Sequence, residues 1–274
     1  EAVSALDRYA RTPRRLADAV SQTCERLPTL HGAQMFGLHW DTVRLLERRA
    51  LQAALSDLPK AQPRRLVMDE FALFKGHRYA SVVLDADTRR VLWIGEGGSR
   101  AAVRPFFEEL GPEGCARIEA VAMDMNTAFD LEVRQHCPNA RVVYDLFHVV
   151  AKYGREVIDR VRVDEANRLR HDKPARQVIK QARWLLLRSP QNLKTPEQQV
   201  RLEDLLAANH ALMKVYLMKT ELKTLWTPST AWGWRSAWKQ WLRHAHESEI
   251  PALIQFAKRL KGYWRGIVSR VRWP

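Results

Sequence analysis

Apolar positions in the first 60 residues recur at helical spacing, without the alternation typical of strands. Pro28 ends a first helical stretch. The stretch HGAQMFGLHWDTVRLLERRALQAAL then predicts a short helix, a turn at Gly37 and a longer helix. The inner face of the longer helix is predicted at Val43, Leu45, Leu46 and Ala50. Residues 1–60 therefore predict a helical domain that is either a helix-turn-helix or a plain helical hairpin.

From residue 64 to residue 153 the pattern changes to short apolar runs separated by turn signals. These runs predict strands at 65–71, 78–85 and 89–95, a helix at about 100–110, a strand at 117–124, a helix at 126–136 and a strand at 140–145. The order β-β-β-α-β-α-β predicts an α/β domain with a mixed sheet. It matches a ribonuclease-H-like sheet, in which the first and fourth strands lie side by side and parallel.

Residues 154–274 return to helical periodicity and hold most of the ten tryptophans. Trp234, Trp238 and Trp241 lie at helical spacing. Because a tryptophan-rich helical segment is more often a core than a base-stacking surface, we expect these three to be buried. The third segment is therefore predicted to be an all-helical insertion.

Charge is the most informative part of the composition. The chain has 45 Lys and Arg against 31 Asp and Glu, a net charge of +14, which favours a polyanion such as nucleic acid as partner. Three arginines on the longer helix after Gly37 also favour a nucleic-acid partner: Arg44, Arg48 and Arg49. No run is apolar enough for a membrane span and no signal peptide opens the chain, so we expect a soluble intracellular protein. Cys24, Cys115 and Cys137 lack the spacing of a disulfide framework or zinc site.

Two carboxylates stand out: Asp69 lies within the first predicted strand, and Asp124 ends the fourth. Each alone is best explained as an ordinary strand-end carboxylate. If the two strands are parallel neighbours, however, the carboxylates lie close together and repel, unless a divalent cation reverses the sign of the interaction. Hard oxygen ligands suit Mg²⁺ or Mn²⁺, and such a site can hold two ions that clamp a phosphodiester. We therefore predict a metal site at Asp69 and Asp124.

Three blocks in order carry a family resemblance: VMDEFALFKGHRYASVVLD, VAMDMNTAF and ARVVYDLFHVVAK. They resemble the core of the D-D-E insertion-sequence transposases of the ISL-three group, which also have a helix-turn-helix just upstream. The resemblance implies a ribonuclease-H-like catalytic domain interrupted by a helical insertion, with Asp69 and Asp124 as the first two catalytic carboxylates. The family's Cys-rich zinc segment has no counterpart here. Its third catalytic residue, a Glu, is expected beyond Pro274.

Several further residues are candidates for the site or for DNA contacts. Asp145 and His148, in the YDLFH block, are expected to border the site, although Asp145 is nearly as well explained as a helix N-cap. Glu70 is expected on the opposite face of its strand from Asp69. Lys75 or His77, in the turn after the first strand, is a candidate phosphate contact, with a solvated hairpin as the alternative. A basic helical face, or merely a solvated helix, is predicted at Arg155, Arg160, Arg162, Arg168, Arg170 and Lys173.

The predicted function is that of a DNA transposase, which cuts transposon ends and joins them to target DNA. The expected partners are double-stranded DNA and a second copy of the chain, in the bacterial cytoplasm at the nucleoid and with no membrane. Two alternatives remain open. One is a catalytically incomplete DNA-binding remnant that acts as a repressor or end-binding protein; the other is a host nuclease or resolvase with the same sheet.

Overall fold

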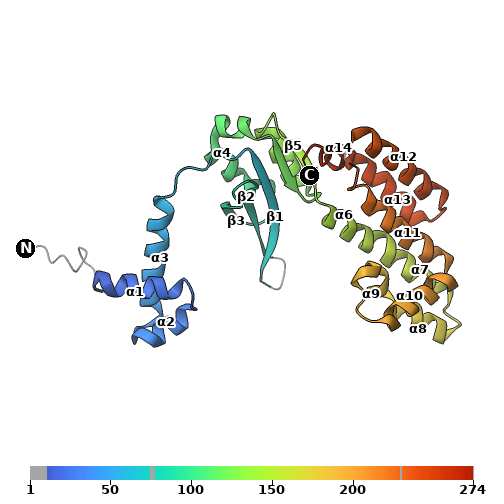
Figure 1. The fold of residues 1–274 in the computed structure, drawn as a ribbon, viewed down its shortest axis with the longest axis horizontal. Coiled ribbons are helices and arrows are strands. Elements are labelled where there is room, and N and C mark those ends of the chain that lie inside the picture. Colours follow the sequence, from blue (N-terminus) through green and yellow to red (C-terminus); the bar gives the residue numbers. More distant parts are fainter. Residues whose placement is uncertain (1–10, 75–77, 229, 274) are drawn as a thin grey trace, which may run out of the picture. The chain divides into compact units, whose positions relative to one another are not determined.

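The structure is a computed structural model that describes residues 11–74, 78–228 and 230–273. The chain divides into two compact units, Glu1–Ala61 and Gln62–Pro274 (Figure 1). Each unit has its own cluster of buried hydrophobic residues. The predicted catalytic core and helical insertion both fall within the second unit.

Three helices form the described part of the first unit: α1 (Arg14–Cys24), α2 (Thr29–Phe36) and α3 (Trp40–Ser56). Gly37 ends α2 with a φ of 62°, a conformation that glycine adopts without steric cost. The small core consists of Val20, Ala33, Val43 and Leu46. The prediction was therefore right for Val43 and Leu46 but wrong for Leu45 and Ala50, which are exposed. The described part of this unit has a small core, so part of its apolar side chains stay on the surface.

The second unit begins with a five-stranded sheet in the order β3-β2-β1-β4-β5. Its strands are β1 (Arg65–Phe74), β2 (Arg78–Asp85), β3 (Val91–Glu96), β4 (Ala120–Met123) and β5 (Arg141–Tyr144). The first three are antiparallel, whereas β4 pairs in parallel with both β1 and β5. The predicted parallel pairing of the first and fourth strands is thus present. The turn at Lys75 to His77 lies outside the described residues.

Two helices, α4 (Arg100–Arg117) and α5 (Thr127–His136), connect β3 to β4 and β4 to β5. The predicted helix at 100–110 was too short, and the strand predicted at 117–124 began too early. Gly111 adopts a φ of 73° and breaks the helix, but Pro112 starts a second helical segment that continues to Arg117. Proline fits the first turn of a helix, so this Gly-Pro pair kinks α4 rather than ending it.

The sheet buries one face and leaves the other partly open. Leu66, Met68, Val121 and Met123 join the same buried cluster as side chains of α4 and α5, including Phe107 and Phe129. The intervening residues Val67 and Ala122 are only half-buried. Alternation along the strands therefore separates a core face from a second, more accessible face.

The remainder of the second unit is helical, as predicted. It starts with α6 (Leu146–Tyr153), a π-helical turn (Gly154–Ile158) and α7 (Asp159–Arg168), which are consecutive along the chain. The later helices are α8 (Lys173–Gln181), α9 (Arg183–Leu187), α10 (Pro196–Ala208), α11 (His210–Thr224), α12 (Ala231–Glu247), α13 (Pro251–Leu260) and α14 (Trp264–Ser269). Short 3-10 turns cover Pro190–Asn192 and Lys261–Tyr263.

Both ends of this helical segment meet the sheet at β5. Helix α6 comes directly after β5, and α14 packs against it (Figure 1). A Cβ at Gly266 would lie 2.4 Å from the Tyr144 ring, so this close approach requires glycine. Tyr263 also meets the Tyr144 ring edge-on, with centroids 5.4 Å apart. The helical segment thus leaves the sheet and returns to the same edge.

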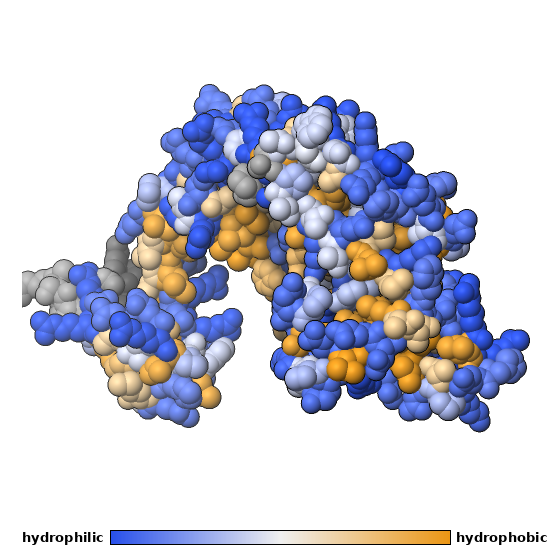
Figure 2. Space-filling view, turned by 45° about the vertical axis from the view of Figure 1, so that its right-hand side comes forward, coloured by the Kyte–Doolittle hydropathy of each residue, from blue (hydrophilic) through white to orange (hydrophobic). Residues whose placement is uncertain are grey.

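Trp234, Trp238 and Trp241 are buried on α12, which confirms the core prediction. No helix in the described ranges is both long and apolar enough to cross a membrane. Hydrophilic residues cover most of the face shown in Figure 2, interrupted by separate apolar patches. Among the large apolar side chains that stay exposed are Phe71, Phe74 and Ile94 on the sheet.

Candidate active site

Three aspartates come level at one end of three neighbouring parallel strands: Asp69 lies within β1, and Asp124 and Asp145 directly follow β4 and β5. Val67 pairs with Ala122 between β1 and β4, and Met123 pairs with Tyr144 between β4 and β5. Continuing these two registers places Asp69 beside Asp124, and Asp124 beside Asp145. Because strand side chains alternate, all three carboxylates project from the same face of the sheet.

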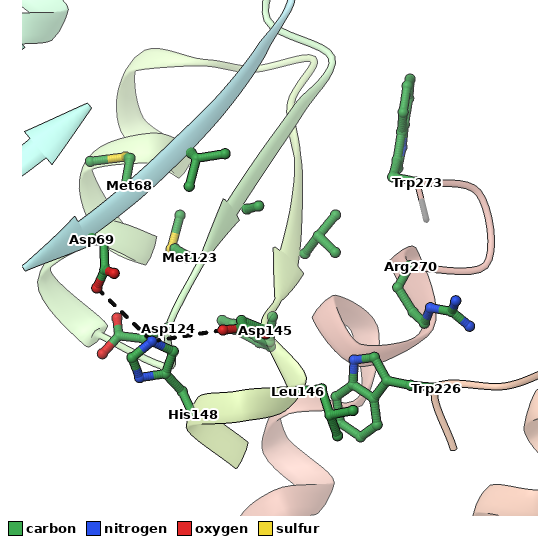
Figure 3. A pocket seen from close by; sticks show the side chains of 14 residues that line it. Met68, Asp69, Met123, Asp124, Asp145, Leu146, His148, Trp226, Arg270 and Trp273 are labelled. Carbon is green, nitrogen blue, oxygen red and sulfur yellow. Dashed lines mark ion pairs between the residues drawn. The ribbon is translucent and has the colours of Figure 1, made fainter. Parts of the chain in front are cut away.

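A cavity of about 370 Å³ lies over this face (Figure 3). Its lining combines the three aspartates with aliphatic strand residues and with side chains from α6 and from the C-terminal segment. The lining residues include Val67, Asp69, Ala122, Asp124, Val143, Asp145, Leu146, His148, Trp226, Arg270 and Trp273. The cavity thus joins an acidic side to an apolar and aromatic side.

His148 lies between two of the carboxylates. Its Nε2 is 3.9 Å from Asp69 Oδ1 and 3.8 Å from Asp145 Oδ2, both within ion-pair distance but too long for hydrogen bonds (Figure 3). Asp145 also caps α6, since the Phe147 backbone N–H donates to Asp145 Oδ1 at 3.0 Å. Asp145 is therefore the N-cap of α6, and it also lines the cavity; its part in a catalytic site stays a prediction.

Asp124 is the most deeply placed of the three carboxylates. Burial raises the pKa of Asp124 above its usual value; the positive charge that His148 can carry lowers it, and the negative charge of Asp69 raises it again. Its Oδ1 is buried and has no hydrogen-bond partner among the described residues. A buried carboxylate oxygen normally has a donor or a cation beside it. His148, Lys152 and the Asn126 backbone N–H offset part of this charge, but Asp124 Oδ1 itself is left without a donor among the described residues.

Glu70 lies apart from this cavity, as alternation predicted, yet it is linked to the same strand ends. The side-chain amide of Asn126 donates to Glu70 Oε1 at 2.6 Å, while the Asn126 side-chain oxygen caps α5. The pKa of Glu70 is raised by burial and by the nearby charges of Asp124 and Asp69, and lowered by the Asn126 hydrogen bond. The Asn126 hydrogen bond thus stabilises the Glu70 carboxylate, which the negative charges of Asp124 and Asp69 repel.

The donor set suits a hard divalent cation only in part. The carboxylates of Asp69 and Asp124 are oxygen ligands of the kind that Mg²⁺ and Mn²⁺ prefer, and the unpartnered oxygen of Asp124 fits a cation. Within the described ranges, however, no group of three or more His, Cys, Asp or Glu side chains is arranged to hold a metal ion. Any bound ion would therefore need further oxygen donors, such as water or a substrate phosphate.

The residues predicted to contact DNA are distributed over both units. Arg44, Arg48 and Arg49 are exposed on α3, and the Arg44 guanidinium stacks over Trp40 at 5.1 Å from the ring centroid. Lys75 falls outside the described residues. Arg155 is exposed and, within the described part of the chain, forms no ion pair.

Arg155 is exposed whereas Arg162 is mostly enclosed, so Arg162 does not lie on an exposed basic helical face as predicted. Only 14% of the Arg162 side chain is exposed; Arg162 pairs with Asp159 at 3.2 Å and donates to the Lys180 carbonyl at 3.1 Å. Residues seven apart share a face of an α-helix, but the π-helical turn at Gly154–Ile158 adds a residue and rotates the later positions about the helix axis. Other arginines of the set are paired with acids: Arg160 with Asp164 and Arg168 with Glu165.

Sequence reasoning missed four residues around the site: Asn126, Trp226, Arg270 and Trp273. The Asn-Thr pair after Asp124 is a recognisable helix-cap signal, so Asn126 could have been found. Nothing in the local sequence of the other three shows that α11 and α14 bring them to the carboxylates, because that requires the path of the whole helical segment.

Comparison with known proteins identifies the class. A transposase family model of the ISL3 group matches residues 66–273. The chain is 52% identical over 275 residues to the transposase for insertion sequence element IS1001 of Bordetella parapertussis, a match that covers all of this chain and 67% of that protein. It is 28% identical over 251 residues to the transposase for IS1557 of Mycobacterium tuberculosis, covering 83% of this chain and 56% of that one.

These matches make the chain a transposase sequence. It belongs to the ISL3 family of insertion-sequence transposases, which confirms the resemblance seen in the sequence. The chain spans between about half and two thirds of the length of these relatives.

Proposed function

We propose that this chain carries the DNA-binding and catalytic part of a transposase that cuts the ends of an insertion sequence and joins them to target DNA. The observation that carries the proposal is that Asp69, Asp124 and Asp145 line one cavity, at one end of the parallel strands β1, β4 and β5. The family relationship supports a DNA-processing enzyme. The strand order, with three antiparallel strands followed by two parallel ones, supports a ribonuclease-H-like core.

Asp69 and Asp124 would hold Mg²⁺ or Mn²⁺. When bound, the ions supply activation of the attacking oxygen and stabilisation of the leaving oxygen of a phosphodiester. The unpartnered Oδ1 of Asp124 supports this assignment.

The remaining side chains of the site would position these ligands. His148 lies at ion-pair distance from both Asp69 and Asp145, and its protonated form would attract the two carboxylates toward itself. Asp145 fixes the start of α6 and with it the place of His148. In the proposed reaction, water and then a DNA 3′-hydroxyl attack the phosphodiester, with no covalent protein–DNA intermediate.

DNA binding by the first unit is the second part of the proposal. Helix α3 would act as the recognition helix of a helix-turn-helix, supported by the tight turn at Gly37 and by the exposed Arg44, Arg48 and Arg49. Two transposon ends must be processed together, so we propose that two copies of the chain act as a dimer. The protein would act at the bacterial nucleoid.

Cleavage of DNA that carries the ends of the insertion sequence, measured with and without Mg²⁺, tests this function. Cleavage should require the metal and should disappear in Asp69→Ala and Asp124→Ala, while both variants still bind the ends. Glu109→Ala, an exposed carboxylate on α4, is the matched control and should cleave normally. Metal-dependent cleavage that survives both aspartate substitutions would refute the assignment.

A further inference from the structure

The tryptophans of the second unit fall into two kinds. Trp234, Trp238 and Trp241 are buried and stack on one another, with neighbouring ring centroids 5.1 and 6.4 Å apart. Trp226 and Trp273 are half-buried and line the cavity beside the aspartates. Neither stacks on an aromatic ring of the described residues, although the Arg272 guanidinium lies 5.3 Å from the Trp273 ring centroid and covers one face of that ring. The first group builds the core, whereas the second offers aromatic surface to the cavity.

Two polar groups accompany these indoles. Arg270 lines the cavity; within the described ranges its guanidinium makes one long contact, 3.5 Å to the Pro228 carbonyl, and has no acidic partner. The indole N–H of Trp273 is buried without an acceptor among the described residues. Figure 3 shows Trp226, Arg270 and Trp273 across the cavity from Asp69 and Asp124. A buried indole N–H usually donates to an acceptor. The Trp273 N–H has none in the described part of the chain, so a ligand with an acceptor atom could complete its hydrogen bonding.

The chemistry of the cavity selects among possible occupants. Its floor is aliphatic, formed by Val67, Ala122 and Val143, and its wall is aromatic. The three carboxylates along its edge would repel a bare phosphate. A flat, neutral ring would pack on the aliphatic floor and stack on the indoles. Acceptors on its edge would bind the Arg270 guanidinium and the Trp273 N–H.

We propose that this cavity receives an unpaired nucleobase of the DNA strand whose phosphodiester lies at the aspartates. Trp226 and Trp273 stack on the base, and Arg270 and the Trp273 N–H donate to acceptors on its edge. The inference rests on the proposed function, because that function is what brings a DNA strand to the aspartates. A base held here fixes the neighbouring phosphate relative to Asp69 and Asp124.

Photo-crosslinking of the full chain to a short single-stranded oligonucleotide that contains 5-iodouracil tests the proposal, with EDTA present so that no cleavage occurs. Mass spectrometry should find the adduct on Trp226 or Trp273. In the same buffer, Trp226→Ala should weaken binding roughly 5- to 100-fold, the range expected when one stacked base is lost. Trp226→Phe should restore most of the affinity. Trp232→Ala, which removes an indole that is 82% exposed and does not line the cavity, should change nothing.

Adducts confined to other residues would overturn the proposal, as would a folded Trp226→Ala chain that binds as tightly as Trp232→Ala. Circular dichroism reports whether Trp226→Ala folds; if it does not, the adduct map of the unsubstituted chain decides. Asp69→Ala separates the two hypotheses, since it should abolish cleavage and keep the adduct. Mg²⁺-dependent cleavage without an adduct removes the base site alone, and an adduct without any cleavage removes the catalytic role alone.

Discussion

The side-chain amide of Asn126 donates a 2.6 Å hydrogen bond to Glu70, joining the residue after Asp69 to the residue that caps α5. The same side chain accepts from the Ala128 backbone N–H at 2.8 Å. One residue therefore both starts a helix and holds a carboxylate that Asp124 and Asp69 repel.

This double role predicts different results for two substitutions. Asn126→Ala loses the cap and the bond and should lower the free energy of unfolding by about 1–2 kcal/mol. Asn126→Asp keeps a capping oxygen but places a carboxylate against Glu70, which raises the pKa of Glu70 further. Its destabilisation should therefore grow as the pH rises above about 4, where the unfolded state ionises.

Chemical denaturation of both variants at several pH values measures these effects. Asn192→Asp, at an exposed 3-10 turn, is the control and should show little pH-dependent change. Equal destabilisation of Asn126→Asp at pH 4 and pH 7 would contradict the role of Glu70.

Arg155 and Arg162 form a matched pair on one helical stretch. Arg162 is mostly buried and bonded to Asp159 and to the Lys180 carbonyl, so Arg162→Ala should cost about 1–3 kcal/mol of stability. Arg155→Ala should leave stability unchanged and reduce affinity for DNA, because the exposed guanidinium is available to a phosphate. Arg162→Ala should lower the melting temperature, whereas Arg155→Ala should keep the melting temperature and lower the DNA affinity. A stable Arg162→Ala chain with weakened DNA binding would contradict the structure.

Lys219 makes stability depend on pH in the alkaline range. Its ammonium group lies among the carbonyls of Leu186 and Arg188, at 2.5 and 2.8 Å, and burial lowers the pKa of Lys219 to about 7. In the unfolded chain Lys219 keeps its proton up to about pH 10.4. Between about pH 7 and 10.4 the unfolded state therefore binds one proton more at Lys219 than the folded state. The contribution of Lys219 to the free energy of unfolding should therefore rise as the pH increases from about 7 toward 10.

Lys219→Met should remove this rise and should also lower stability, because two carbonyls lose their donor. Lys239→Met, at an exposed position of α12, should keep the rise. Denaturation midpoints across this pH range make the comparison. A rise of the same size in Lys219→Met would show that another group titrates.

Asp124 predicts a stabilising substitution. Because burial and the charge of Asp69 raise its pKa, the ionised form is unfavourable in the folded state, and stability falls as the pH rises from the usual carboxyl value to the raised one. In EDTA at neutral pH, Asp124→Asn should thus raise the melting temperature, by about 2–4 °C for a gain on the order of 1 kcal/mol. Calorimetry measures this shift; a lower melting temperature in EDTA would mean that the charge is already compensated.

The sequence predicted the strands and their parallel pairing because the signals are local: apolar runs, turn residues and their order. The register was not given by these signals alone: Asp69 lies within β1, and it comes level with Asp124 because Val67 pairs with Ala122. The helix α4 was misjudged because Gly111-Pro112 signals a stop as strongly as a restart, and only packing of the second segment decides.

The other side of the cavity could not be predicted. Trp226 and Trp273 reach the aspartates through a helical segment that leaves β5 and returns to it, a path set by tertiary packing. Arg162 was misplaced because a π-helical turn has no clear sequence signal and shifts every later residue around the helix. Local patterns found the carboxylates, whereas long-range packing determines which side chains face them.

The central claim is that Asp69 and Asp124 together bind a divalent cation. Electron paramagnetic resonance of free Mn²⁺, titrated into the full chain, tests it without any need for activity. The unsubstituted chain should remove Mn²⁺ from solution, Glu109→Ala should do so equally, and Asp69→Ala and Asp124→Ala should each lose most of the uptake. Undiminished Mn²⁺ binding in both aspartate variants, or none in the unsubstituted chain with its DNA ends present, would contradict the account.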